Sequence, residues 1–305
     1  MKQTSTLFLV RPSNIRSNEE TALNNFYQQN NLQNQDFQTL ANLEFDTLVE
    51  KLKSVGIQVL VYEINDELDT PDAHFPNNWI SFHKKGVVVI YPMFAPNRRL
   101  ERRGSVLEFI KQQNLSIDQV IDYSEYEIQN LFLEGTGALV LDRVNKKAYC
   151  ALSDRAHSQL LNQFCQDFNY IPVSFIANQP VNGERKPIYH TNVMMCVAEH
   201  FAVICLECID NELEQKNVVE HLINNHKEIV ELTEEQLTHF AGNMLEVINN
   251  SQQNYLVMSS SAYNCLTNKQ LNQIQTHCKI IHSPIPTIES LGGGSVRCMM
   301  AEVIL

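Results

Sequence analysis

Cys298 follows three consecutive glycines near the end of the chain, in "LGGGSVRCMM". A cysteine acts as a nucleophile when its thiolate is accessible and stabilised by its surroundings. Glycines adopt backbone conformations that other residues avoid, and their amide groups are free to face a thiolate or a developing oxyanion. The alternatives are a small core thiol, or a phosphate loop that would need a following lysine and helix. The pattern favours a nucleophile at Cys298.

Two polar residues in apolar stretches have the chemistry of proton carriers. His190, in "IYHTNVMM", follows a strand-like run and is one of ten histidines. Cysteine–histidine pairs meet in space rather than in sequence, so spacing does not select among these histidines. An interior histidine with a structural role describes His190 equally well. Glu134, in "FLEGTGALV", stands where a solvated carboxylate is not expected, so we interpret it as a proton carrier or a partner for a polar substrate.

Two further stretches suit either a binding site or an ordinary surface. The stretch "PDAHFPNNW" contains Asp72, His74, Asn77 and Asn78, which are also typical turn residues after a proline. The stretch "APNRRLERR" predicts a solvated helix face, although an arginine at its start can grip a carboxylate through two parallel hydrogen bonds. Each polar stretch adjoins a strand-like run, and polar groups at strand ends converge in α/β proteins. We therefore expect one shared site.

The hydrophobic pattern predicts an α/β protein. Runs typical of strands occur at Leu7–Val10, Gln58–Tyr62, Gly86–Tyr91, Ala138–Leu141, Lys147–Ala151, Phe201–Leu206, Tyr255–Met258, Lys279–His282 and Val296–Leu305. Helical spacing occurs at Asp36–Val55, Arg99–Gln113, Asp154–Phe168, Asn211–Asn225 and Thr267–Thr276. The order strand, strand, helix, strand recurs without a repeat in the residues themselves. This recurrence favours a propeller-like array of α/β units around a central axis, while an open α/β sheet also fits the periodicity.

Composition restricts the class of partner. The chain has 305 residues, of which 44% are hydrophobic, and no linker-like segment divides it, so we expect one catalytic domain over residues 1–305. A formal net charge of -12 argues against nucleic acid and anionic membranes and favours a small-molecule substrate. No signal peptide or membrane-length apolar span is recognised, so we expect a cytoplasmic protein. A homo-oligomer is compatible with the sequence.

The eight cysteines are expected to be free thiols, mostly in the core, because no secretory signal accompanies them. Cys205 and Cys208 have the spacing of a redox or zinc pair. A closed zinc site needs four ligands, and no second pair completes one. We therefore expect neither a metal nor an organic cofactor.

Several motifs together resemble the guanidino-group-modifying superfamily, the arginine deiminases and amidinotransferases. In order they are "VRPSN", "PNNWISFH", "YPMFAPNRRLERR", "LEGTGALVLDR", "YHTNVMM", "FAGNMLE" and "PTIESLGGGSVRCMMAEV". More narrowly, the chain is similar to the citrulline ureidases, or citrulline utilisation hydrolases. The resemblance implies the pentein fold, a five-bladed α/β propeller of repeated ββαβ units around a central active site.

The resemblance also implies roles for individual residues. Cys298 matches the family nucleophile, His190 its general acid/base, and Glu134 the acidic residue that pairs with the histidine or with substrate nitrogens. Arginines for the substrate α-carboxylate fall at Arg98 and Arg155, and we include Asp72 among the substrate-binding candidates. Other arginines that remain open for the carboxylate are Arg11, Arg99 and Arg143.

Two positions depart from the deiminase pattern. Arginine deiminases hold the cationic guanidinium with two aspartates, and the matching positions here are Asn78 and Asn192. A buried guanidinium needs carboxylate partners, whereas a neutral ureido group needs both a donor and an acceptor, which an asparagine amide supplies. The two asparagines therefore predict a neutral substrate, for which L-citrulline is the natural candidate.

The resulting hypothesis is a cysteine-dependent hydrolase that converts L-citrulline to ornithine, carbon dioxide and ammonia through a covalent thio intermediate. Cys298 attacks the ureido carbon and His190 carries the protons. The first alternative is a deiminase or amidinotransferase that acts on a guanidino compound such as arginine. The second is a catalytically silent member that binds an amino acid or a protein.

Overall fold

One sheet topology recurs five times in residues 5–28 and 36–305, the part of the chain that the computed structural model describes. In each of these three-stranded sheets the central strand pairs antiparallel with one neighbour and parallel with the other. Parallel neighbours need a crossover connection, and a helix lies in each of the five. The predicted α/β class and the strand, strand, helix, strand order are therefore confirmed.

The strands group as follows. The first sheet contains β1 (Thr6–Val10), β2 (Gln58–Tyr62) and β17 (Ala301–Val303). The second contains β3 (Ile80–His83), β4 (Val87–Ile90) and β5 (Gln119–Asp122). The third contains β6 (Val140–Asp142), β7 (Lys147–Ala151) and β8 (Ile171–Phe175). The fourth contains β11 (Met195–Val197), β12 (Phe201–Ile204) and β13 (Glu228–Glu231). The fifth contains β14 (Leu245–Ile248), β15 (Asn254–Ser259) and β16 (Lys279–Ser283), and a separate hairpin joins β9 (Asn178–Val181) to β10 (Glu184–Pro187).

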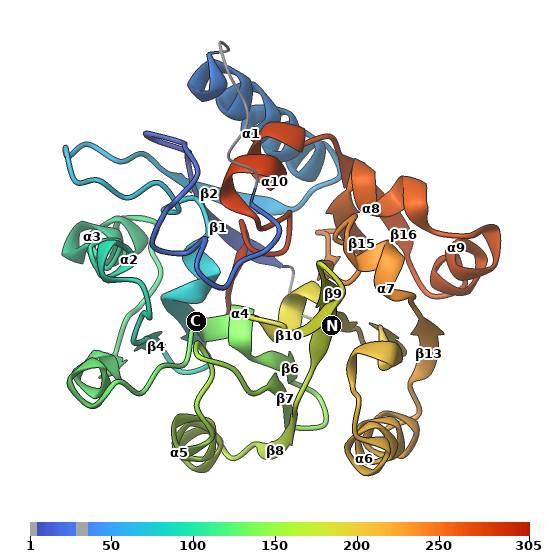
Figure 1. Cartoon of the computed structure of the whole chain (residues 1–305). Helices are drawn as coiled ribbons and strands as arrows, with labels where there is room; N and C mark the ends of the chain where they lie inside the picture. Colours follow the sequence, from blue (N-terminus) through green and yellow to red (C-terminus); the bar gives the residue numbers. More distant parts are fainter. Residues whose placement is uncertain (1–4, 29–35) are drawn as a thin grey trace.

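The longer helices lie at the periphery of the view in Figure 1. They are α1 (Phe37–Ser54), α3 (Gly104–Gln112), α5 (Ser158–Phe168), α6 (Glu212–Ile223) and α9 (Asn268–Gln275). Shorter helices are α2 (Pro96–Arg99), α4 (Gly135–Ala138), α7 (Glu234–Leu237), α8 (Ser260–Cys265) and α10 (Pro286–Gly292). Single 3₁₀ turns are η1 (Pro76–Asn78), η2 (Ser124–Gln129), η3 (Thr191–Val193) and η4 (Leu206–Cys208).

The first sheet joins the two ends of the described chain. Strand β17 pairs antiparallel with β1, with Phe8 opposite Ala301, and β17 also lies against β3 of the next sheet. Strand β11 lies between β6 and β14. The loop between α10 and β17, which carries Cys298, is thus anchored at both ends. A closed five-bladed propeller goes beyond these pairings and stays a prediction.

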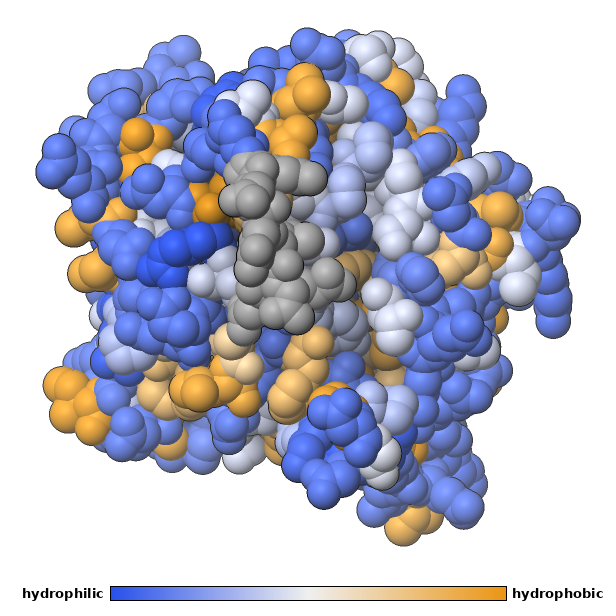
Figure 2. Space-filling view, turned by 45° about the horizontal axis from the view of Figure 1, so that its top comes forward, coloured by the Kyte–Doolittle hydropathy of each residue, from blue (hydrophilic) through white to orange (hydrophobic). Residues whose placement is uncertain are grey.

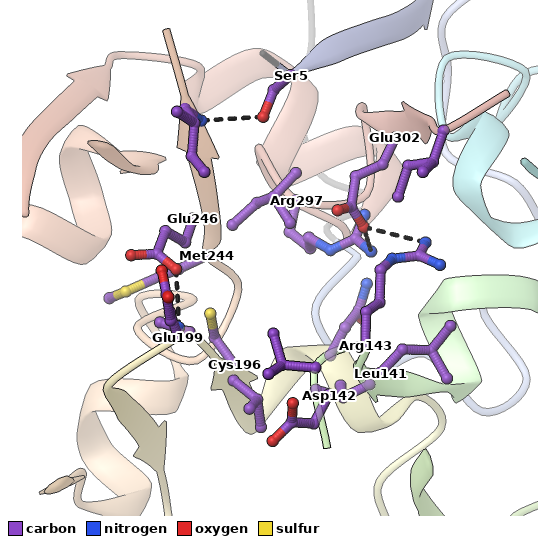
Figure 3. Close-up of a pocket in the computed structure, with 18 of the residues that line it drawn as sticks. Ser5, Leu141, Asp142, Arg143, Cys196, Glu199, Met244, Glu246, Arg297 and Glu302 are labelled. Carbon is purple, nitrogen blue, oxygen red and sulfur yellow. Dashed lines mark hydrogen bonds and ion pairs between the residues drawn. The ribbon is translucent and has the colours of Figure 1, made fainter. Parts of the chain in front are cut away.

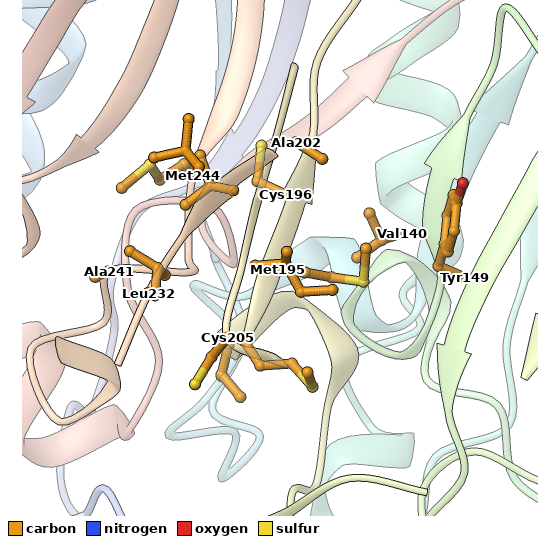
Figure 4. Packing of buried hydrophobic residues seen from close by; sticks show 14 of the residues in the cluster. Val140, Tyr149, Met195, Cys196, Ala202, Cys205, Leu232, Ala241 and Met244 are labelled. Atoms are coloured by element: carbon orange, nitrogen blue, oxygen red, sulfur yellow. The ribbon is translucent and has the colours of Figure 1, made fainter. Parts of the chain in front are cut away.

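The cysteines confirm the expectation of core thiols. All eight are free, and seven of them are buried. Cys205 and Cys208 lie in the largest apolar cluster with their sulfurs 3.4 Å apart, and Figure 4 shows Cys205 and Cys196 among the packed side chains of this cluster. Among residues 5–28 and 36–305, no group of three or more His, Cys, Asp or Glu side chains is arranged to hold a metal ion.

The predicted elements match the structure where one face of a strand or helix is clearly apolar. The predictions at Gln58–Tyr62 and Lys147–Ala151 coincide with β2 and β7, and those at Asp36–Val55 and Thr267–Thr276 exceed α1 and α9 by one residue at each end. The predicted strand Val296–Leu305 is wrong over most of its length. Only Ala301–Val303 pairs with a neighbouring strand, because the preceding residues form turns closed by hydrogen bonds such as Cys298 N–H to the Ser295 carbonyl.

The surface in Figure 2 is mostly hydrophilic, with small separate apolar patches. No helix in the described part of the chain combines the length and the apolar character needed to cross a bilayer. The hydrophilic surface agrees with the acidic composition of the chain.

A buried histidine makes stability dependent on pH. His83, at the end of β3, stacks on Phe168 with the ring centroids 4.3 Å apart, and burial lowers the pKa of His83 from 6.5 to about 2. Below pH ~6.5 the imidazole of His83 binds a proton in the unfolded chain but not in the folded chain. The contribution of the neutral, buried His83 to the free energy of unfolding is therefore lost as the pH falls. In chemical denaturation, the wild type should lose about 2 kcal/mol more than His83→Phe between neutral pH and about pH 5. Equal losses in the two proteins would contradict this assignment.

Candidate active site

The glycine loop that carries Cys298 is shaped by close packing. Gly293 ends α10 in the left-handed conformation (φ +62°), which a side chain would strain. A Cβ at Gly292 would lie 2.6 Å from the Phe75 ring, and one at Gly294 would lie 2.9 Å from it. The glycines therefore let the loop approach Phe75. A role for their amides in stabilising an oxyanion stays a prediction.

Two asparagine amides hold the sulfur of Cys298. Nδ2 of Asn192 lies 3.4 Å from Sγ and Nδ2 of Asn243 lies 3.3 Å from it. Cys298 is 2% exposed. Asn243 is itself fixed, because its Nδ2 also donates to the Asn192 carbonyl at 3.0 Å and its Oδ1 accepts the Arg297 backbone N–H at 2.9 Å. The nucleophile candidate thus faces amide donors rather than carboxylates.

Asn243 is a site residue that sequence reasoning missed. It lies in "FAGNMLE", which contributed only to the resemblance. The available signal was the neighbouring Gly242, where a Cβ would lie 2.4 Å from the Val193 carbonyl oxygen. Gly242 is required because another part of the backbone approaches it closely, and Asn243 follows it in an apolar stretch. This combination indicates that the Asn243 amide is buried, but it does not identify the partner of the amide.

His190 and Glu134 form a buried pair. Oε2 of Glu134 lies 2.7 Å from Nε2 of His190, and its Oε1 accepts the Phe94 N–H at 2.9 Å. Burial would raise the pKa of Glu134, but Arg155, His190 and Arg98 together lower it to about 2. Burial lowers the pKa of His190 to about 4, against the opposing effect of Glu134. The pair is therefore an ionised carboxylate beside a neutral imidazole, with Nε2–H donating and Nδ1 left as the acceptor.

Arg98 and Arg155 compensate the charge of Glu134. Their Nη1 atoms lie 3.9 Å and 3.6 Å from Oε2 of Glu134. Arg98 donates to both carboxylate oxygens of Glu101, at 2.9 and 3.0 Å, and to Oδ1 of Asn78 at 2.8 Å. Asn78 thus lies beside the ion pair, and its contact with a substrate stays a prediction.

Helix α4 places Glu134 and keeps space beside it. It packs between η1, which carries Asn78, and η3, which follows His190. Glu134 precedes α4 and its N–H donates to the Arg155 carbonyl at 3.0 Å. A Cβ at Gly137 would lie 2.3 Å from Nδ2 of Asn78 and 2.8 Å from Nδ1 of His190. Gly137 is therefore required for the two side chains to meet over the helix.

The N-terminal segment 18–28 covers this group of residues. Arg155 donates to the Thr21 carbonyl at 3.0 Å and to Oδ1 of Asn24 at 2.9 Å. Asn25 donates to the Gly293 carbonyl at 3.1 Å, so the same segment is tied to the glycine loop.

Asp72 is held by this covering segment but keeps one free oxygen. Its Oδ2 accepts from Nδ2 of Asn18 at 2.7 Å and from Thr21 at 3.2 Å, whereas its buried Oδ1 has no hydrogen-bond partner among the described residues. Burial raises the pKa of Asp72, and Arg98 and Asn18 oppose this. The free oxygen is an acceptor available to a ligand.

The other three arginines that the sequence left open lie elsewhere. Arg11 pairs with Asp46 and Glu63, Arg99 with Glu127, and Arg143 with Glu302. Arg98 and Arg155 are the two candidates that contact Glu134. Their binding of a substrate carboxylate stays a prediction.

Residues 11–305 match the family described as N,N-dimethylarginine dimethylhydrolase, eukaryotic. The chain belongs to this family. The identification agrees with the resemblance of its motifs to the guanidino-group-modifying superfamily. No curated protein sequence matches the chain.

Solved structures of pentein enzymes share the fold of this dimethylarginine dimethylhydrolase family member. ArgZ, an arginine dihydrolase from the ornithine-ammonia cycle in cyanobacteria, aligns with a TM-score of 0.75 and 17% identity over 98% of this chain, which spans only 40% of ArgZ. The N-terminal domain of ArgZ, in a cysteine-to-serine variant bound to substrate, aligns at 0.72 and 16% identity, with 99% and 100% of the two chains covered. A Pseudomonas aeruginosa dimethylarginine dimethylhydrolase complexed with citrulline aligns at 0.67 and 12%, also covering 99% and 100%.

Gly137→Ala should damage the site without unfolding the protein. The added methyl group displaces Asn78 or His190, and a shift of about 1 Å in a catalytic group lowers kcat/KM by about a hundredfold. The measurement is ammonia release from citrulline or arginine, with circular dichroism as the check on folding. The matched control is Gly104→Ala in α3, where no atom lies within 4 Å of the added Cβ. Full activity in Gly137→Ala would show that the crowding is harmless.

Asn243→Ala tests the residue that the sequence did not reveal. Loss of one amide donor to Sγ should lower kcat by roughly 10- to 100-fold, the value of a hydrogen bond to a charged group. The same variant should slow the alkylation of Cys298 by iodoacetamide, followed by mass spectrometry of the labelled peptide. Asn272→Ala, on an exposed position of α9, is the control. Unchanged rates in both assays would remove Asn243 from the site.

Proposed function

We propose that this protein hydrolyses the ureido group of L-citrulline to ornithine, carbon dioxide and ammonia. The observation that carries the proposal is the pair of amide donors, from Asn192 and Asn243, on the sulfur of Cys298. A carbonyl oxygen of a ureido group can accept from such donors, and so can the oxyanion that forms when sulfur attacks. Oδ1 of Asn192 is buried without a partner among the described residues, so it remains available to a substrate N–H.

The carboxylate of Glu134 already has partners within the protein. Each of its oxygens accepts a hydrogen bond, and two arginines and a histidine lie around it. A guanidinium would therefore find no unoccupied carboxylate oxygen on Glu134, and the side chains that contact Sγ of Cys298 are the amides of Asn192 and Asn243. A buried cation without such a partner is strongly disfavoured, whereas a neutral ureido group is not.

In this proposal the α-groups of the amino acid bind to Asp72 and Arg155. The free Oδ1 of Asp72 suits the substrate ammonium. Arg155 suits the carboxylate once Thr21 and Asn24 have moved away from its guanidinium. Arg98, which already pairs with Glu101, then contributes its charge more than its hydrogen bonds.

The chemistry follows from the state of His190. Its Nδ1 takes the thiol proton, and the Cys298 thiolate forms a bond to the ureido carbon. Collapse of the tetrahedral intermediate breaks a carbon–nitrogen bond, and Nδ1–H returns the proton to the departing nitrogen. Water, deprotonated by the same Nδ1, then releases the group left on sulfur and restores the thiol. Hydrolysis of that group gives carbamic acid, or the corresponding N-substituted acid if ammonia left first, and this acid decomposes to carbon dioxide and the second amine, so the products are ornithine, ammonia and carbon dioxide.

In the same proposal the five sheets are the blades of the pentein propeller, and Cys298, His190 and Glu134 lie on its axis. The shared topology of the sheets and the likeness to pentein structures support this arrangement. The chain then works without a cofactor, because a thiol and an acid/base suffice for the reaction.

Hydrolysis of arginine is the second candidate. Its support is the likeness of the fold to ArgZ, which acts as an arginine dihydrolase. The amides around Cys298 favour the neutral substrate.

Product analysis separates the two candidates. Purified protein incubated with L-citrulline should release ornithine and ammonia, and with L-arginine it should be slower by about a hundredfold or more because a cation would be buried unpaired. Accumulation of citrulline from arginine, with no ornithine from citrulline, would overturn the proposal.

Restoring the carboxylates tests the same point from the protein side. Asn78→Asp combined with Asn192→Asp should lower kcat/KM for citrulline by about a hundredfold, because a carboxylate next to Sγ opposes both the thiolate and the oxyanion. Asn130→Asp, at an exposed turn, is the matched control and should be neutral. Unchanged citrulline turnover in the double variant would show that these side chains do not face the reacting group.

A further inference from the structure

A cavity borders the candidate active site at Asn192. Its volume is about 390 Å³, within the range of small-molecule sites, and the ends of β6, β11, β14 and β17 line it (Figure 3). Neither Cys298 nor His190 nor Glu134 is part of the lining. The exposed residues Lys84 and Val144 lie on its border, so the cavity opens to solvent away from the covering segment 18–28.

One side of this cavity carries two arginines that share a single carboxylate oxygen. Nη2 of Arg143 lies 3.4 Å from Oε2 of Glu302, and Nη2 of Arg297 lies 3.7 Å from the same atom. Arg297 is 7% exposed, and Nη1 of its guanidinium donates to the Met300 carbonyl at 2.7 Å. Burial lowers the pKa of Arg297, against the opposing effect of Glu302. Arg98 is a contrast, because Glu101 meets it with both oxygens.

The other acidic residues that line the cavity do not compensate the positive charge of Arg143 and Arg297. Figure 3 shows Glu199 and Glu246 on the opposite side of the cavity from Arg143 and Arg297. Glu246 accepts from the Glu199 N–H at 2.8 Å and from Asn254 at 2.9 Å. Asp142 pairs with Lys227 at 3.2 Å. The excess positive charge therefore stays on the arginine side.

Between the two sides the lining is apolar, with contributions from Val140, Met195, Val197, Met244 and Leu245. We propose that this cavity binds a small aliphatic carboxylate, with its charged end on Arg143 and Arg297 and its hydrocarbon body against these side chains. A guanidinium pair matches the planar geometry of a carboxylate. A free phosphate would meet the same charge but would leave the apolar lining uncovered.

The cavity is joined to the nucleophile by two residues. Asn192 lines it and also donates to Sγ of Cys298, and the backbone N–H of Arg297 holds Asn243. A carboxylate bound to Arg297 therefore contacts the loop that carries Cys298, on the side of the loop that faces this cavity.

The test is calorimetric titration of the full chain with sodium hexanoate. The wild type should bind, Arg143→Gln should bind at least about tenfold more weakly, the value of one charge-assisted hydrogen bond, and Arg155→Gln should bind like the wild type. Retention in Arg143→Gln with loss in Arg155→Gln would move the ligand to the substrate site and overturn the proposal. Circular dichroism checks the folding of each variant.

Two more probes on the wild type keep the proposal testable if a variant fails to fold. Hexylamine has the same body with the opposite charge and should not bind. Inorganic phosphate has the charge without the body and should bind more weakly than hexanoate. Equal binding of hexylamine, or no binding of hexanoate, would overturn the proposal, and tighter binding of phosphate would replace the carboxylate with a different anion.

Discussion

The buried charge of Glu134 is the constraint on which the site depends. A carboxylate with 0% exposure is tolerated only when cations and hydrogen-bond donors surround it, and here they come from three parts of the chain. Phe94 supplies an N–H, Arg98 and Arg155 supply charge, and His190 supplies a ring N–H. The stretch 94–98, Arg155 and His190 lie far apart in sequence, so the folded sheets are needed to bring them together around Glu134.

The same constraint explains why the region of Cys298 is built from amides. Glu134 is occupied by its own partners, and the side chains that contact the sulfur are Asn192 and Asn243. Amides both donate and accept, and they hold no charge that a ligand must balance. In the proposed function, the site discriminates by hydrogen-bonding pattern, and its charged residues orient His190 and the α-groups of an amino acid.

Much of this arrangement could be predicted from the sequence, because the decisive residues sit in stretches that a soluble core does not require. Glu134, His190 and Cys298 stand out for that reason, and the alternation of apolar runs predicts the central strands. The outer strands β5, β8 and β13 were not predicted, because they are partly exposed edges with polar residues such as those of "EIVE". Asn243 was not identified as a site residue from the sequence either, because its position depends on contacts with Asn192 and Arg297, which are distant in sequence. The cavity at Arg143 depends on the same kind of long-range contact.

The most direct test is the crystal structure of the Cys298→Ser variant with L-citrulline. The amide-lined site predicts the ureido carbon beside the serine oxygen, with the ureido oxygen within hydrogen-bond distance of Nδ2 of Asn192 or Asn243. A ligand with its ureido group directed away from these amides, or with an arginine guanidinium bound in their place more readily than citrulline, would contradict it.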